Sequence, residues 1–211
     1  MSVAPLSLDS LPLFPLQTVL FPEGLLRLRV FEARYLDLVT LCLRTGAPFG
    51  VVCILDGSEV RQPGHEQIRP VRFEAIGVLA HVQDLDAEQA GILTLRCQGS
   101  QRFTLATPTQ RGDGLWLAQA QLHADDERQA VPPEQLACAQ ALAQAISALA
   151  AHGHDEQFAL PHRLDDAGWV ANRWCELLPI PIAAKQRLMA LDEPLLRLRL
   201  VDDYLRGQGV V

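Results

Sequence analysis

Apart from one helical stretch at residues 32–44, hydrophobic residues change from strand-like to helical spacing at a charged segment that spans residues 125–129. Before this segment, apolar residues alternate with polar ones or form short continuous runs, as is typical of β-strands. After it, apolar residues recur at helical spacing. A chain in which strands come first and helices second is expected to fold as an α+β protein. We therefore predict a β-domain over residues 1–125 and an α-helical subdomain over residues 126–211.

Two stretches near the N-terminus indicate how the β-domain begins. In residues 25–30, apolar side chains alternate with Arg27 and Arg29, which predicts a strand that is buried on one face only. Residues 11–16 contain two prolines, which cannot donate hydrogen bonds to a neighbouring strand. We therefore expect residues 11–16 at the edge of a sheet.

A helix is predicted over residues 32–44, where the apolar spacing becomes helical. An arginine lies in its last turn and Gly46 follows, which predicts the end of the helix at that glycine. The side chains expected to face inward are Tyr35, Leu38, Val39 and Cys42.

Further strands are predicted at residues 49–55, 73–85, 92–97, 103–106 and 115–122. Gly77 lies inside the longest of them and indicates a bulge or a sharp bend. We expect a turn at residues 98–100 and a hairpin at residues 111–114, both of which contain glycine. Roughly six or seven short strands with one helix favour a closed or nearly closed β-barrel.

The second part of the chain predicts helices only. The residues expected to start or cap them are Pro133, Asp165 or Asp166, and Asp192. Trp169 and Trp174 are five positions apart and so do not share a helix face. We expect one of these tryptophans in the core, and the other could be exposed.

The overall charge and the cysteine pattern restrict the class of protein. The net charge of −7 argues against a general nucleic-acid binder, which needs a positive field. The five cysteines form no C-x-x-C pair, and their odd number favours buried, reduced thiols. The N-terminus lacks a basic region followed by an apolar block, and no apolar helix is long enough to span a bilayer. We expect a cytoplasmic protein with no membrane contact.

Three sets of side chains could carry chemistry, and each is interpreted as structural or solvent-exposed. A metal site was considered for His152, His154, His162, Asp155, Asp165 and Asp166, but their spacing fits no common zinc pattern. General acid–base catalysis was considered for Asp84, Asp86 and Glu88, but these residues are expected at the solvated end of a hairpin. Ser58 and Ser100 lie in no G-x-S-x-G motif. We therefore expect no catalytic residue, no metal and no cofactor.

An ordered set of short motifs resembles the N-terminal, substrate-binding domain of Lon proteases. The motifs are LPLFPL at residues 11–16, LFPEG at 20–24, FEARY at 31–35, FGVV at 49–52, AIGVLA at 75–80, GSQRF at 99–103, LP at 178–179 and KQ at 185–186. The resemblance covers most of the chain and implies a PUA-like β pseudo-barrel that is followed by helices.

The chain departs from full Lon proteases outside this resemblance. Those proteins continue with an ATPase module and with a protease module that uses a Ser–Lys pair. This sequence contains no G-x-x-x-x-G-K-[ST] motif for phosphate binding, and its only lysine is Lys185. We expect a stand-alone binding protein that is not an enzyme; a hydrolase with an undetected site is the least favoured alternative.

Two binding functions are compatible with the sequence. The resemblance favours recognition of protein or peptide segments, through an apolar groove or through strand addition to an open sheet edge. The groove candidates are Phe31, Tyr35, Phe49, His81 and Trp116, each of which could equally be core. The alternative is an RNA-binding module that uses an arginine-rich face of the barrel, made by Arg27, Arg29 and Arg102. The same arginines could instead form ordinary surface ion pairs.

Overall fold

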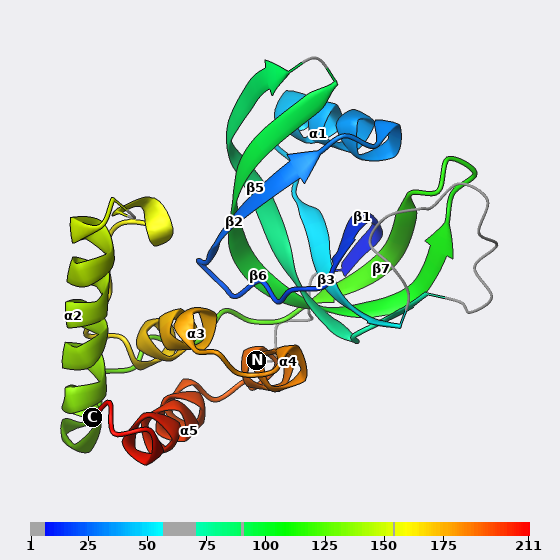
Figure 1. The fold of residues 1–211 in the computed structure, drawn as a ribbon. Helices are drawn as coiled ribbons and strands as arrows, with labels where there is room; N and C mark the ends of the chain where they lie inside the picture. The colour runs from blue at the N-terminus through cyan, green and yellow to red at the C-terminus, as the bar shows by residue number, and fades with distance from the viewer. Residues whose placement is uncertain (1–6, 57–70, 90, 154) are drawn as a thin grey trace. The chain divides into compact units, whose positions relative to one another are not determined.

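The computed structural model describes residues 7–56, 71–89, 91–153 and 155–211 (Figure 1). Its contacts divide the chain into two units. The barrel unit contains residues 1–22 and 26–124, and the helical unit contains residues 23–25 and 125–211. The fold is α+β, as predicted, with strands before helices. That the two parts are separate domains, divided at residue 125, stays a prediction.

The elements of the barrel unit are β1 (Ser7–Leu16), β2 (Leu25–Val30), α1 (Ala33–Thr45), β3 (Phe49–Asp56), β4 (Arg72–Phe73), β5 (Ile76–Gln89), β6 (Ile92–Gln110) and β7 (Trp116–Leu122). Neighbouring strands pair in the order β1-β7-β6-β5-β3-β4, and β1 also pairs with β3. This second pairing closes a ring of five strands, to which β2 is attached through β6. The predicted closed barrel is therefore present.

The predicted edge position of β1 is wrong in an informative way. Residues from Ser7 to Leu13 pair antiparallel with β7, and residues from Leu13 to Leu16 pair parallel with β3. The strand thus has partners on both sides, but the two partners overlap only at Leu13. Pro12 lies in the first stretch and Pro15 in the second, so each proline faces a partner strand on one side only.

The predicted turn at residues 98–100 is also wrong, because β6 continues through it. A Cβ atom at Gly99 would lie 2.3 Å from the backbone oxygen of Phe21 and 3.1 Å from the side chain of Leu20. The glycine is required by this close approach of two backbones and does not mark a turn. The predicted hairpin at residues 111–114 is present between β6 and β7, where the Arg111 amide donates to the Leu115 oxygen at 2.8 Å.

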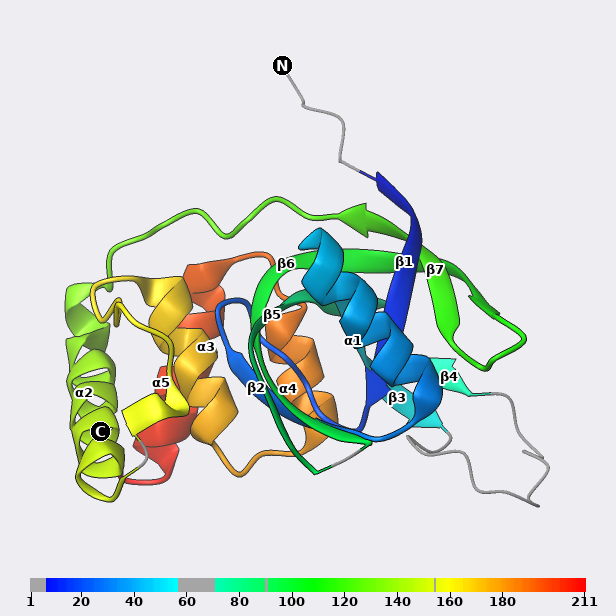
Figure 2. The same cartoon turned by 90° about the horizontal axis from the view of Figure 1, so that it is seen from above.

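The core of the barrel unit comes from alternating residues of several strands and from one face of α1. One cluster of buried side chains consists of Leu11, Leu13, Val52, Leu79, Phe103, Ala118 and Ala120. The four residues of α1 that were predicted to face inward are all buried. The helix ends as predicted at Gly46, which has a φ of 71° and whose amide donates to the Cys42 oxygen at 2.8 Å. Figure 2 shows α1 running in front of the strands that it covers.

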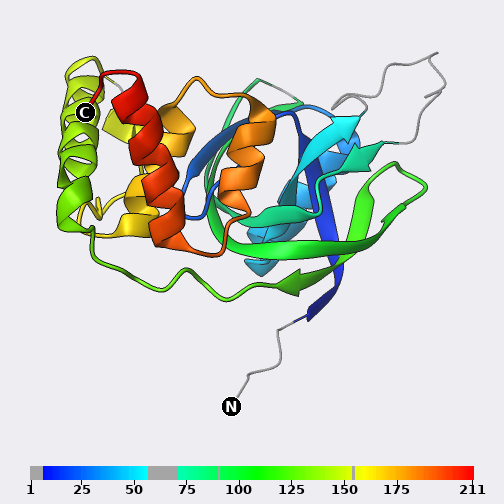
Figure 3. The same ribbon diagram turned by 90° about the horizontal axis from the view of Figure 1, so that it is seen from below.

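The helical unit contains two short 3-10 turns (Pro133–Gln135 and Asp155–Gln157) and the helices α2 (Leu136–Ala151), α3 (Ala167–Leu177), α4 (Ile182–Met189) and α5 (Pro194–Gly207). The centre of this unit is α3, which contacts α2, α4 and α5 and is buried at every residue from Ala167 to Cys175. Figure 3 shows α5, in red, beside α2. Asp166 caps α3 as predicted, since its carboxylate accepts from the Gly168 amide at 3.0 Å.

Two expectations for the helices are corrected. Trp169 and Trp174 are both buried, and the Trp174 indole donates to the Cys138 oxygen at 3.1 Å. Both side chains can be covered because α3 has neighbours on several sides. The residue that precedes α5 as its cap is Glu193 instead of Asp192, and its side chain makes no capping hydrogen bond.

Candidate functional site

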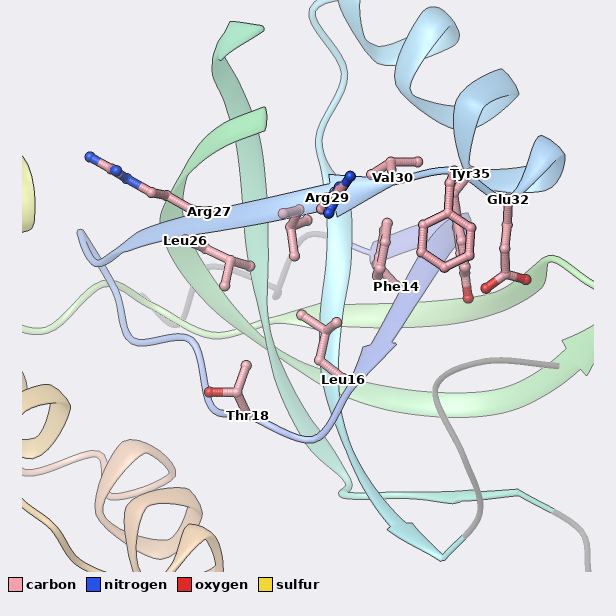
Figure 4. A pocket seen from close by; sticks show the side chains of 11 residues that line it. Phe14, Leu16, Thr18, Leu26, Arg27, Arg29, Val30, Glu32 and Tyr35 are labelled. Atoms are coloured by element: carbon pink, nitrogen blue, oxygen red, sulfur yellow. The ribbon is translucent and has the colours of Figure 1, made fainter. Parts of the chain in front are cut away.

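A hollow of about 300 Å³ lies in the barrel unit beside β2 (Figure 4). It is bordered by the end of β1, the segment after it, all of β2 except its first residue, and the start of α1. The lining residues are Phe14, Leu16, Thr18, Leu26, Arg27, Leu28, Arg29, Val30, Phe31, Glu32 and Tyr35. This volume is at the lower end of the range for ligand pockets, so it suits a few side chains and not a folded domain.

The strand β2 borders the hollow with its edge. Successive side chains of a strand point to opposite faces, yet seven consecutive residues, Leu26 to Glu32, all line the space. Since Arg27 points away from the space, part of this stretch lines it with backbone atoms, as the edge of a strand does. Among the described residues β2 pairs with β6 alone, so one edge carries backbone groups that no other strand engages.

The floor of the hollow is aromatic and held in place. The Phe14 ring stacks on the Tyr35 ring with centroids 4.1 Å apart, and it contacts Phe49 behind it at 5.8 Å. The Arg34 guanidinium lies 4.7 Å from the centre of the Tyr35 ring. Arg34 also donates to the Gly114 oxygen at 2.8 Å and pairs with the Glu32 carboxylate at 2.7 Å. These contacts join the start of α1 to β1 and to the β6–β7 hairpin, and so make a preformed surface.

The rim combines one exposed apolar side chain with positive charge. Phe31 is 53% exposed, although it is a large hydrophobic residue. Arg27 and Arg29 are both exposed, and Figure 4 shows Arg27 pointing away from the hollow while Leu26 points into it. Arg29 has no ion-pair or hydrogen-bond partner within the described part of the chain.

A model of the substrate-binding domain of the ATP-dependent protease La (Lon) matches residues 10–207. This chain belongs to the Lon substrate-binding domain family. A solved structure described as a Lon N-terminal domain protein from Xanthomonas campestris is 34% identical, with a TM-score of 0.71 and coverage of 92% of this chain and 97% of that one.

A more distant likeness supports the fold of this Lon-family chain. The N-terminal domain of a Mycobacterium avium complex Lon protease is 17% identical, with a TM-score of 0.58 and coverage of 93% of this chain and 97% of that one. A comparison with curated proteins gave no match. The family is a substrate-binding domain, which agrees with the motif-based expectation, and no helix in the described ranges is long and apolar enough to cross a membrane.

The structure brings together two of the five groove candidates in this Lon-family domain. Phe31 and Tyr35 both line the hollow, Phe31 on its rim and Tyr35 in its floor. Phe49 is only 1% exposed behind Phe14, so its place in the groove is corrected to the core. His81 is half-buried on β5 opposite Gln98, and Trp116 packs edge-to-face on Phe73 at 5.1 Å, so neither lines the hollow.

The predicted arginine-rich face loses one of its three members. Arg102 is only 3% exposed, and therefore presents no surface to an anionic ligand, whereas Arg27 and Arg29 stay on the rim of the hollow. The position of Arg102 on β6 gave no sign of this burial, because an arginine at a partly buried strand position usually reaches solvent.

Several lining residues were not predicted as site residues, chiefly Phe14, Leu16 and Thr18. The continuous apolar run at residues 13–16 carries a signal that could have found them. A strand with one solvated face alternates, so an uninterrupted run indicates that both faces meet apolar surroundings. In this barrel one such face is the interior and the other is the floor of the hollow.

The side chains considered for chemistry were compared with the described part of the structure. Within the described ranges no group of three or more His, Cys, Asp or Glu residues could hold a metal ion. Ser58 and His154, and the side chains of Glu88 and Asp155, lie outside the described residues. All five cysteines are buried, and burial raises the pKa of Cys97, Cys138 and Cys175 to about 12. These three side chains are therefore thiols, not thiolates, at neutral pH.

Proposed function

We propose that this chain is a non-catalytic module that binds extended polypeptide segments in the hollow beside β2. The observation that carries the proposal is that an edge of β2, with which no other described strand pairs, borders an apolar hollow. A strand edge offers main-chain hydrogen bonds to any extended chain, and an adjacent pocket accepts alternate side chains.

The hollow also offers apolar surface, and burial of this surface would favour binding. Phe14, Leu28 and Tyr35 form an apolar floor, and Phe31 would lose exposed surface when a segment covers it. Burial of a large apolar side chain is worth roughly 1.5–3 kcal/mol, of which binding recovers only the surplus after ordering costs. We therefore expect dissociation constants of about tens of micromolar for a single segment.

Membership of the Lon substrate-binding domain family supports a polypeptide as the ligand. The net charge of −7 and the burial of Arg102 both weaken the alternative of RNA, which needs a broad positive surface. We extend the proposal to a cytoplasmic module that works without ATP.

The test is binding of a fluorescently labelled protein that has been kept unfolded by reduction and carboxymethylation. Anisotropy titrations should show saturable binding to the full chain, and Phe31→Ala should weaken it by roughly tenfold. Leu43→Ala is the matched control, because Leu43 is 52% exposed on α1 and does not line the hollow.

Two outcomes would contradict the proposal. The first is no binding at about 100 µM chain, which corresponds to less than about 5.5 kcal/mol of binding free energy. The second is equal weakening by Phe31→Ala and Leu43→Ala, which would place any binding elsewhere.

A further inference from the structure

We propose that the preferred segment alternates apolar and acidic residues and aligns along the edge of β2 with which no described strand pairs. This inference rests on the proposed function and names the chemistry of the polypeptide. It follows from the fact that consecutive residues of β2 line the hollow, and that the two faces of this strand differ in character.

The two faces of β2 have opposite chemistry. Leu28 and Val30 are buried on one face, with Leu26 half-buried beside them, whereas Arg27 and Arg29 are exposed on the other. In a strand that pairs with β2, each residue lies directly opposite one residue of β2 and on the same face of the sheet. The added strand therefore presents its own alternate residues to the leucine face and to the arginine face.

The apolar face selects apolar partners because it is continuous with the hollow. Leu26 points toward Leu16 across this space in Figure 4, and Phe14 and Tyr35 complete the floor. A polar side chain placed there would lose its hydrogen bonds to water without replacement. Alternate residues of the bound segment are therefore aliphatic or aromatic.

The arginine face selects carboxylates. Among the described residues that line the hollow, Glu32 is the only acidic one, and its carboxylate pairs with Arg34 at 2.7 Å. Arg29 has no partner in the described ranges, so an incoming carboxylate opposite it displaces no ion pair. Opposite charges in cross-strand pairs stabilise a sheet, and like charges directly opposite each other destabilise it. The remaining positions of the segment are therefore aspartate or glutamate.

A short acidic segment also fits the charge of the whole chain better than a long polyanion does. The chain carries −7 overall, so an extended nucleic acid would be repelled beyond the two arginines. A segment of five or so residues stays within roughly a Debye length of Arg27 and Arg29, about 8 Å at physiological salt.

The experiment compares three peptides of one length in which leucine and phenylalanine alternate with glutamate, with glutamine or with lysine. Anisotropy is measured with the full chain at about 0.15 M salt. We expect the glutamate peptide to bind roughly fivefold tighter than the glutamine peptide, with the lysine peptide weakest. In the variant Arg27→Glu/Arg29→Glu the order should invert, so that the lysine peptide binds best.

Two controls isolate the arginines and the strand pairing. Arg199→Glu changes an exposed arginine on α5 that does not line the hollow, and it should leave the order of the peptides unchanged. A glutamate peptide that is N-methylated at alternate residues cannot form a full ladder, and it should bind roughly tenfold more weakly. Melting curves of both variants establish that they are folded.

The outcomes separate this inference from the proposed function. Equal binding of the three peptides would overturn the acidic preference while leaving polypeptide binding in place. Binding of the unfolded protein together with no binding of any alternating peptide would overturn the inference alone. No binding of either would overturn both. Undiminished binding of the N-methylated peptide would overturn strand addition, and tighter binding of a single-stranded RNA oligomer than of the glutamate peptide would overturn the choice of ligand.

Discussion

The ring of Phe14 stacks on the ring of Tyr35, with centroids 4.1 Å apart and ring planes inclined by 19°. One residue comes from β1 and the other from the first turn of α1. The pair therefore joins the strand that closes the barrel to the helix that packs on it, and the same two rings form the floor of the proposed binding hollow.

Phe14→Ala should destabilise the chain by about 3–5 kcal/mol, because it removes a buried aromatic ring that contacts both Tyr35 and Phe49. Urea unfolding followed by tryptophan fluorescence measures the loss. Phe31→Ala, at a half-exposed position, should cost less than about 1 kcal/mol. Equal losses for the two variants would show that the Phe14–Tyr35 stack contributes nothing to stability.

Gly99→Ala should be strongly destabilising, by about 3 kcal/mol or more, because its Cβ would lie 2.3 Å from the Phe21 backbone oxygen and the backbones must separate. Thermal unfolding gives the comparison. The matched control is Gly112→Ala, where a Cβ meets no atom within 4 Å. If Gly99→Ala melts at the same temperature as Gly112→Ala, the close approach of β6 to Phe21 is not a feature of the native chain.

Arg197→Met should lower the free energy of unfolding by about 3–5 kcal/mol, because this fully buried guanidinium supports several acceptors. It donates to Asp126 at 2.7 Å, to Asn172 at 3.0 Å and to the Leu188 oxygen at 2.9 Å. Arg128→Met is the control, since Arg128 pairs with Asp165 in the exposed part of the same unit and should cost less than about 1 kcal/mol. If Arg197→Met and Arg128→Met have the same free energy of unfolding, the packing of the methionine compensates for all the hydrogen bonds of Arg197, and the prediction is wrong.

Asp113 should make stability depend on pH in the acid range. The Arg111 guanidinium, with a hydrogen bond from the Leu115 amide, lowers the pKa of this carboxyl to about 2. A carboxyl with a lowered pKa in the folded chain stabilises it above the unfolded pKa, and this contribution is lost as the pH falls through the folded pKa. Asp113→Asn should therefore be less stable than the native chain at about pH 6, and the difference should narrow toward about pH 2. Denaturant midpoints across this range test the prediction; a constant difference would contradict it.

The local pattern of the sequence was sufficient where each residue's environment depends on its near neighbours. The alternation in β2, the inward face of α1, the glycine that ends α1 and the Asp166 cap are all of this kind. The α+β class followed from them, because the order of strands and helices along the chain needs no knowledge of how they pair.

Contacts between distant residues could not be predicted from a single sequence. Pro12 and Pro15 predicted an edge strand, yet β1 has two partners that divide its length between them. Gly99 predicted a turn, because the approach of Phe21 to it is a tertiary contact. The local sequence did not indicate that Arg197 is buried, because its partner Asp126 lies at the other end of the helical unit's sequence.

The candidate site could be predicted only in part, because it too depends on contacts between distant residues. Phe31 and Tyr35 stood out by their residue type near the ends of elements, and both line the hollow. Phe49 and Arg102 have the same local signals and are buried. Burial alone does not separate the two pairs, because Tyr35 is only 4% exposed and yet lines the hollow. Which buried side chain lines the hollow depends on its tertiary neighbours, and a single sequence does not give these.

The two-sided pairing of β1 also has a consequence for the order in which the barrel forms during synthesis. Ser7 lies opposite Gln121 in β7, so the ring closes only after nearly the whole barrel unit has left the ribosome. Such a long-range pairing is a slow step in folding. In this interval β1 can pair with β3 alone, and its other edge is open to strands of neighbouring chains. Pro12 lies in the part of β1 that pairs with β7. Because proline has no amide proton, the open edge of β1 is a poorer template for aggregation before β7 is available.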